Sequence, residues 1–401
     1  MNLNPDRYIS ARVTKGDEPD TLAVDYSIYE ANPWHWFLQI DNAGTKDRRY
    51  TPRVGLINTN LLGFDDELTI FYQAPWESGI EDRYSLYGSY DVPVFTPKLR
   101  LTMFAGYSQF DIDGGGGIDF LGHGSVYGGE LRYNLFREGN WFFDVISSLS
   151  REESKIGSSD KTFESLYGIP LPNTGKVIMD LWGIGVDLHK RSDMSNTSVR
   201  FDRVENIGGS SQRRFWDKDA QPIATGIRTN SKRNFALYTT AATHSQYLDD
   251  NKVQRFSGSV RYIVPDKRVA PSKMTTFGGM YSVRGYKESG IVADGGVLAS
   301  VQYEYDLVKQ DAANGMVSDP DNKLALRKLA PLVFFDYGRA RTEDALDSED
   351  AAQELYSVGV GGLIEIGKNL SGAVYYGFPL QDTSTTDTGD GRLNLSLLLR
   401  W

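Results

Sequence analysis

Hydrophobic and polar residues alternate with a period of two along most of this chain. A clear stretch is residues 99–108, where one face carries Leu99, Leu101, Met103, Ala105 and Tyr107. At the end of the chain, a second stretch places on one face Leu393, Leu395, Leu397, Leu399 and Trp401. The opposite face of both stretches is mainly Arg, Thr, Ser, Asn and Gly, and Leu398 is an exception in the second. Such alternation is typical of β-strands that separate an apolar from a polar environment.

Sixteen segments with this pattern predict sixteen strands. They span 33–43, 51–60, 66–75, 82–91, 97–108, 124–136, 140–150, 177–190, 195–205, 233–245, 252–263, 293–306, 329–340, 353–366, 369–378 and 391–401. The connections alternate between short turns, such as 137–139, and the long loops 109–123, 151–176, 206–232, 264–292 and 379–390. Outer-membrane barrels have short periplasmic turns and long outer loops, and an even strand number lets the last strand close on the first. We therefore expect an all-β fold, a transmembrane antiparallel β-barrel of about 16 strands; only the long connection 307–328 departs from the pattern.

The composition agrees with a barrel rather than a helical membrane protein. The mean hydropathy is −0.41, which a barrel tolerates because each strand shows only every second residue to lipid. No stretch of about twenty apolar residues is present, so a transmembrane helix is excluded. Aromatic residues make up 12% of the chain and include 23 tyrosines, which favour the interface between membrane and water.

Charge, cysteine content and the first residues limit the remaining possibilities. A net charge of −10 argues against a nucleic-acid partner. The absence of cysteine excludes disulfides and thiol chemistry. Residues 1–6 have neither the basic start nor the apolar core of a signal peptide, so we expect a fragment, a mature form or a truncated gene product.

No motif points to an enzyme, a metal or a cofactor. The four histidines are far apart and show no metal-ligand spacing: His35, His123, His189 and His244. The run Gly114–Asp119 fits one calcium-binding repeat, but such repeats act only when stacked, and we interpret it as the tip of an outer loop. No Gly-Lys-Ser/Thr follows, which argues against a phosphate loop.

One set of charged residues remains. The segment 277–286 carries Arg284 within a long outer loop, and two later strands place the carboxylates Glu304 and Asp336 on their lumen faces. An arginine brought into the lumen by a folded-in loop could pair with these acids, because the guanidinium fork suits bidentate carboxylate binding. From composition alone, an exposed loop arginine and two unrelated lumen acids are the simpler interpretation.

A resemblance changes this weighing. Val283, Arg284, Gly285 and Tyr286 resemble the VRGY signature of the superfamily of BamA-type insertases and of two-partner secretion transporters of the ShlB/FhaC/HecB kind. Residues 334–338, with Phe334 and Gly338, resemble the family's F-x-D-x-G strand, and residues 295–304 resemble the strand before it. The order matches as well, because the VRGY loop of the family is the sixth external one of a sixteen-stranded barrel, and 264–292 is the sixth external connection between the predicted strands.

The start of the chain extends the resemblance. Residues 4–7, 15–19 and a strand over 21–29 resemble the end of the second periplasmic POTRA domain of the ShlB/FhaC-type proteins. The resemblance thus implies a POTRA remnant over 1–31 and a barrel over 32–401, with 264–292 inserted in the lumen. The first POTRA domain, most of the second and the usual plug helix are missing from the pattern, and the last residue is Trp401 where the family more often has Phe.

The resemblance also implies a function. It implies an outer-membrane transporter that passes an unfolded exoprotein, such as a haemolysin or adhesin, from the periplasm to the cell surface without ATP. Arg284 would contact Asp336 and Glu304 as a loop latch. The implied partners are the exoprotein, outer-membrane lipid and the barrel-assembly machinery, with a monomer and no cofactor. A BamA-like assembly factor is the alternative, a passive porin is less favoured, and an enzyme is not expected.

Overall fold

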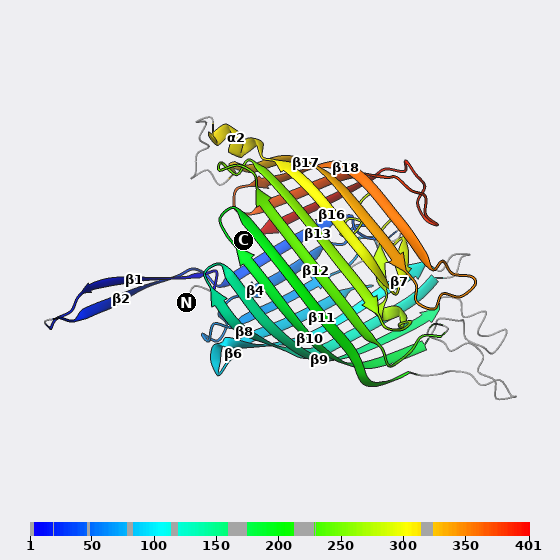
Figure 1. The fold of residues 1–401 in the computed structure, drawn as a ribbon, viewed down its shortest axis with the longest axis horizontal. Coiled ribbons are helices and arrows are strands. Elements are labelled where there is room, and N and C mark those ends of the chain that lie inside the picture. The colour runs from blue at the N-terminus through cyan, green and yellow to red at the C-terminus, as the bar shows by residue number, and fades with distance from the viewer. Residues whose placement is uncertain are drawn as a thin grey trace.

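Sixteen strands form one closed antiparallel barrel (Figure 1). The computed structural model describes residues 4–401 apart from 19, 46–48, 78–82, 114–118, 159–174, 212–227, 229 and 314–323. The barrel strands are β3 (Trp34–Asp41), β4 (Arg53–Asn58), β5 (Glu67–Gln73), β6 (Ser85–Val94), β7 (Thr96–Asp113), β8 (Asp119–Glu138), β9 (Trp141–Ser158), β10 (Gly175–Arg191), β11 (Ser195–Ser211), β12 (Ala236–Tyr247), β13 (Gln254–Pro265), β16 (Gly295–Tyr305), β17 (Leu326–Arg341), β18 (Ala352–Ile366), β19 (Leu370–Pro379) and β20 (Arg392–Arg400).

Each strand pairs with the next, and β20 closes the barrel against β3. The closing pairs run from Ser396 with Asp41 to Arg400 with Phe37. Closure matters because it leaves no strand edge with unpaired backbone groups, which would be costly in hydrocarbon. The predicted fold class is confirmed.

Several strands are longer than the alternation predicted. The strands β7, β8, β9 and β11 continue beyond the apolar stretch, so the loops predicted at 109–123, 151–176 and 206–232 are shorter than expected. The physical reason is that ladder pairing satisfies backbone groups whether or not the side chains face lipid. The glycine run, which was interpreted as the tip of an outer loop, lies outside the described residues. Asp119, which follows it, begins β8.

The two faces of the barrel wall differ in the way that the alternation predicted. On β13, the outward residues Phe256, Val260 and Tyr262 are exposed. On β17, residues on the lumen side are buried at every second position from Ala330 to Ala340, while Val333 and Phe335 are exposed on the outside. An apolar exposed belt is what lipid would cover. Among the described residues, no helix is long and apolar enough to cross a membrane.

A two-stranded hairpin precedes the barrel and projects from the end that carries the short turns (Figure 1). It consists of β1 (Arg7–Lys15) and β2 (Leu22–Glu30), and β2 coincides with the predicted strand over 21–29. At its base, the Asn4 side-chain amide donates to the Thr59 carbonyl oxygen at 2.7 Å. The assignment of residues 1–31 to a POTRA domain stays a prediction.

The connection 307–328, which did not fit the pattern of turn lengths, contains a helix. The helix α2 (Leu307–Ala313) starts directly after β16. The Asp306 carboxylate accepts the backbone N–H of Val308 at 3.1 Å, which is the usual stabilisation of a helix N-terminus. The helix α2 therefore accounts for part of the length of this connection.

Candidate functional site

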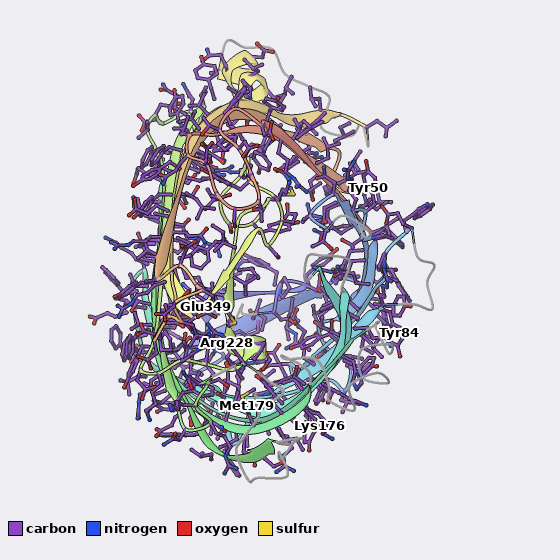
Figure 2. The ribbon with its side chains drawn as sticks, turned by 90° about the vertical axis from the view of Figure 1, so that its right-hand side faces the viewer. Tyr50, Tyr84, Lys176, Met179, Arg228 and Glu349 are labelled. Carbon is purple, nitrogen blue, oxygen red and sulfur yellow. The ribbon has the colours of Figure 1, made fainter. Side chains whose placement is uncertain are left out.

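The sixth external loop enters the barrel lumen. It runs from the end of β13 to the start of β16 and contains a 3-10 turn, η1 (Pro271–Lys273), and a small sheet of β14 (Thr275–Phe277) and β15 (Ile291–Ala293). Figure 2, seen from the end with the long loops, shows this yellow-green segment inside the ring of strands. Phe277, Val283, Tyr286 and Ile291 of the loop form a buried apolar cluster, and Leu355 of β18 belongs to it. The loop is thus a packed part of the lumen.

The loop places Arg284 against Asp336, in the middle of β17. The Arg284 Nε and Nη2 donate to the two Asp336 carboxylate oxygens at 2.7 and 2.8 Å, and the Arg284 backbone N–H donates at 3.0 Å. Ser300 of the neighbouring strand β16 donates its hydroxyl to the same carboxylate at 2.6 Å. Asp336 is 0% exposed. We call the Arg284–Asp336 pair the latch; its carboxylate is fully satisfied, which a buried charge requires.

The rest of the guanidinium is also occupied. Arg284 donates to the Gln302 amide oxygen at 2.9 Å and to the Ser300 hydroxyl at 3.1 Å. Its carbon Cζ lies 3.5 Å from the ring centroid of Phe334 and 4.9 Å from that of Tyr375. Stacking of a desolvated guanidinium on aromatic rings stabilises it further, so Phe334 forms part of the site.

Glycines allow the loop backbone to lie directly on the barrel wall. Gly285 has a φ of +97°, a left-handed conformation that other residues avoid. A Cβ on Gly285 would lie 2.9 Å from the backbone carbon of Gly377, and a Cβ on Gly377 would lie 2.6 Å from the nitrogen of Gly285. At Gly338, a Cβ would lie 2.8 Å from a methyl carbon of Val283. The motif glycines therefore set the contact distance between loop and wall.

Tyr286 fixes the far side of the same turn. Its hydroxyl lies 3.0 Å from the carbonyl oxygen of Tyr356 on β18 and 2.9 Å from that of Gln381, just after β19. It also accepts the backbone N–H groups of both residues, at 3.2 and 3.3 Å. The side chain is 1% exposed. Tyr286 therefore joins the loop to two neighbouring segments of the wall.

The prediction that Glu304 is a second acidic partner of Arg284 needs correction. Glu304 is buried in the lumen wall, but its carboxylate pairs with Arg255 at 2.5 Å and with Lys328 at 3.0 Å. Its connection to Arg284 is indirect, because Gln302 donates to Glu304 at 2.9 Å and accepts from Arg284. The physical reason is position: Asp336 faces Ser300 across the ladder, whereas Glu304 lies four residues further along β16.

The tip of the loop reaches two further strands. The Tyr281 hydroxyl donates to Asp41 of β3 at 3.0 Å. The Glu288 carboxylate accepts the backbone N–H of Met280 at 2.8 Å and lies 3.4 Å from the Asn394 amide nitrogen of β20. Burial of this loop carboxyl raises the pKa of Glu288 to about 7.

Sequence reasoning missed a second set of ion pairs, one buried and one half-buried, at the end of the barrel with the long loops. Arg228 pairs with Asp294 at 2.6 Å and Arg268 pairs with Glu349 at 2.5 Å; Figure 2 labels Arg228 and Glu349 within the ring. We call these two pairs the clasp. The hydrogen bonds from Arg268 hold the pKa of Glu349 below its ordinary value. Of the four clasp residues, only Asp294 had a signal in the sequence, which was its position directly before Gly295. The three other residues lie in loops without a recognisable motif.

The geometry defines a class of protein. It is a membrane-spanning β-barrel whose lumen holds one of its own loops through a buried arginine–aspartate pair. Among the residues that the structure describes, no group of three or more His, Asp or Glu could hold a metal ion. The site as the structure shows it holds the loop against the barrel wall.

The comparisons specify the class. Residues 214–362, which include Arg284 and Asp336, match the model of the haemolysin secretion/activation protein family ShlB/FhaC/HecB. CdiB from Escherichia coli has a similar structure, with a TM-score of 0.75 and 15% identity over 98% of this chain and 67% of that one. CdiB from Acinetobacter baumannii gives 0.71 and 14% over 98% and 66%. BamA from Haemophilus ducreyi lacking POTRA domains 1–3 gives 0.60 and 12% over 98% and 75%.

These findings confirm the predicted resemblance to the two-partner secretion family and the predicted location in the bacterial outer membrane. The structural similarities are below 25% identity, so they establish the fold. The chain spans about two thirds of the length of the two CdiB chains. A comparison with curated protein sequences gave no significant match. The matched family is one of transporters rather than enzymes and implies a secreted protein partner.

Proposed function

We propose that this barrel passes an unfolded exoprotein of the haemolysin or adhesin type from the periplasm to the cell surface, without ATP. The observation that carries the proposal is the latch, because Arg284 and Asp336 lie within the segment that matches a secretion family. A loop that occupies the lumen has to shift before a polypeptide can pass. Its hold on the wall consists of hydrogen bonds, apolar packing and ion pairs, such as Arg284 with Asp336 and Lys273 with Glu152 of β9, which can all be broken and remade.

Charge and burial support a switch-like contact. Arg284 and Asp336 are nearly inaccessible, with side-chain exposures of 8% and 1%. Removal of one partner of a buried pair typically costs about 3–5 kcal/mol, whereas moving both partners apart into water restores the hydration of each. The latch is therefore stable while the lumen is closed. A hydrated polypeptide that enters from the periplasmic side can release it.

The remaining parts of the chain fit accessory roles in this proposal. The β1–β2 hairpin is the end of a periplasmic POTRA domain, where an extended substrate adds as a strand. The exposed belt of the barrel contacts outer-membrane lipid. The barrel-assembly machinery inserts the barrel into the membrane during biogenesis, and the barrel acts as a monomer.

A secretion assay tests the proposal. The protein is produced in the outer membrane of a bacterial host together with a candidate exoprotein of the haemolysin or adhesin type, as wild type, as Arg284→Ala and as Arg339→Ala. Arg339 lies on the same strand as Asp336 and is a matched control, because its side chain is 58% exposed. We expect exoprotein in the medium with the wild type and with Arg339→Ala, and at least about tenfold less with Arg284→Ala.

Two results would overturn the proposal. If the wild type is inserted and folded but exports no exoprotein, dedicated secretion is wrong. A simultaneous fall of many outer-membrane proteins on depletion would then favour the BamA-like assembly factor. A large steady conductance that Arg284→Ala leaves unchanged would instead favour the passive porin.

A further inference from the structure

One part of the lumen wall carries five small hydroxyl side chains, one amide and no charge. On β12, β13 and β16, cross-strand pairing aligns Thr243 with Ser259 and Ser259 with Ser300. The next row on the same face aligns Ser245 with Ser257 and Ser257 with Gln302. We call these six residues the hydroxyl track. They face the lumen, because Ser300 and Gln302 both bind Arg284 of the inserted loop.

The hydroxyl track lines a cavity. The cavity has a volume of about 240 Å³ and includes all six track residues in its lining. None of Thr243, Ser245, Ser257 and Ser259 forms a side-chain hydrogen bond to any residue in the described part of the chain. Thr243 and Ser259 are also exposed. Four hydroxyl groups therefore point into a polar cavity and remain available to a ligand.

Charged residues border the track on both sides. The row beyond Ser259 contains Arg261, and the row beyond Ser257 contains Arg255, which pairs with Glu304 across the ladder. Elsewhere the lumen face carries ion pairs, such as Arg200 with Asp202 and Arg132 with Asp144. The track is thus a neutral band in a lumen where charges are otherwise frequent.

We infer that the hydroxyl track binds the backbone of the polypeptide in transit, an inference that rests on the proposed function. A hydroxyl both donates and accepts, so it can satisfy a peptide N–H or a peptide C=O. Hydrogen bonds between neutral groups are weak, and a neutral wall traps neither acidic nor basic side chains. Three strands about 4.8 Å apart cover roughly 10 Å, the length of about three extended residues.

The track also connects the substrate to the latch. Ser300 and Gln302 belong to both, since they end the two hydroxyl rows and accept hydrogen bonds from Arg284. A peptide backbone that binds along the rows competes with Arg284 for these two acceptors. Entry of the substrate therefore weakens the latch where it meets the track.

Cysteine trapping tests the inference, because the natural chain has no cysteine. Single variants Ser257→Cys and Ser259→Cys are compared with Ser89→Cys and Ser148→Cys, which replace serines on the lumen side of β6 and β9. The probe is the candidate exoprotein of the secretion assay, with one cysteine, stalled in the transporter by a folded cysteine-free fusion. Under mild oxidation, we expect disulfide yields at least about fivefold higher at the two track positions.

Each other outcome has a definite meaning. Equal yields at all four positions, with export intact, overturn the track and leave the proposed transport standing. The absence of export and of cross-links at every position overturns both. As a second measurement, the triple variant Thr243→Val, Ser257→Ala, Ser259→Ala should export at least about threefold more slowly, while Ser148→Ala keeps the wild-type rate; equal rates contradict the inference.

Discussion

Two buried carboxylates hold the inserted loop, and they do so in different ways. Asp336 and Asp294 are both 0% exposed. Asp336 accepts three hydrogen bonds from Arg284 and one from Ser300. Asp294 accepts two from Arg228 and one each from the backbone N–H groups of Val269 and Glu343. The number of hydrogen bonds is therefore the same at both sites.

The difference lies in what each carboxylate joins. Asp336 belongs to the spanning strand β17, so the latch joins the loop to the wall of the lumen. Asp294 lies between β15 and β16, so the clasp joins loops to each other at the end of the barrel with the long loops. In the proposed transport, a substrate that passes through the lumen has to break the first contact but can leave the second intact. We therefore expect the tip of the loop, around Arg284, to be released while its base, around Arg268 and Asp294, stays in place.

The largest expected effect comes from breaking the latch. Asp336→Ala leaves the Arg284 guanidinium buried without its carboxylate, which should weaken docking of the loop tip by about 3–5 kcal/mol. Val283 is 0% exposed and reports on docking when it is replaced by cysteine, since the chain has no other thiol. In the Val283→Cys background, we expect Asp336→Ala to increase the rate of thiol labelling at least about a hundredfold over the protein that keeps Asp336.

A matched control separates the latch from general loosening of the barrel. Glu354→Ala removes an exposed carboxylate from the neighbouring strand β18, where it pairs with Arg339. This variant should label at the wild-type rate, because exposed ion pairs contribute little. Equal labelling of Asp336→Ala and the wild type would show that the latch does not hold the tip.

The sequence predicted the latch better than the clasp for a physical reason. Arg284 and Asp336 lie in short motifs in which the neighbouring glycines and aromatics are constrained too, as Gly285 and Phe334 show. The clasp joins residues from three loops, and Arg228 and Asp294 are 66 residues apart with no periodic pattern around them. Alternation predicts which face of a strand points inward, but it gives no information on how loops meet.

The same limits explain the results for the strands and for Glu304. All sixteen barrel strands were predicted, because lipid and lumen impose a strict period of two. Their ends were missed where ladders continue beyond the lipid, as in β7 and β9. The lumen side of Glu304 was predicted as well, but its partner was not, since Arg255 reaches it only through the register of β13 against β16.

Breaking the clasp should have a smaller and more local effect. Asp294→Ala leaves Arg228 without its carboxylate, a loss of about 3 kcal/mol, but the Arg268–Glu349 pair still holds the base of the loop. Ala270 is 6% exposed and packs in the apolar cluster beneath the clasp, so Ala270→Cys reports on this region. We expect faster labelling at position 270 and an unchanged rate at position 283.

The reverse pattern would remove the distinction between the two sites. If Asp294→Ala also accelerates labelling of Val283→Cys, tip and base are released together, and the loop moves as one piece. Asp336→Ala measured with the cysteine at position 270 gives the complementary result. Independent release requires that each substitution affects its own reporter only.

The smallest expected effect is a dependence of tip docking on pH, through Glu288. Burial raises the pKa of this carboxyl to about 7 from an ordinary value of 4.5, so the docked loop binds a proton more tightly than the released loop. Docking is therefore strongest below about pH 4.5 and weakens as the pH rises through 7, with no further change above. Glu288→Gln stays neutral and keeps an acceptor for the Met280 N–H, so docking should become independent of pH.

The measurement is labelling of Val283→Cys between about pH 5 and 8, divided at each pH by labelling of Leu62→Cys, which is 63% exposed and corrects for thiol ionisation. We expect the ratio to rise by less than about a hundredfold in the wild-type background, most of it below pH 7, and to stay flat in Glu288→Gln. A ratio that is flat in both backgrounds would mean that Glu288 is neutralised or hydrated in the docked loop, and that the tip, like the clasp, is held by contacts insensitive to pH in this range.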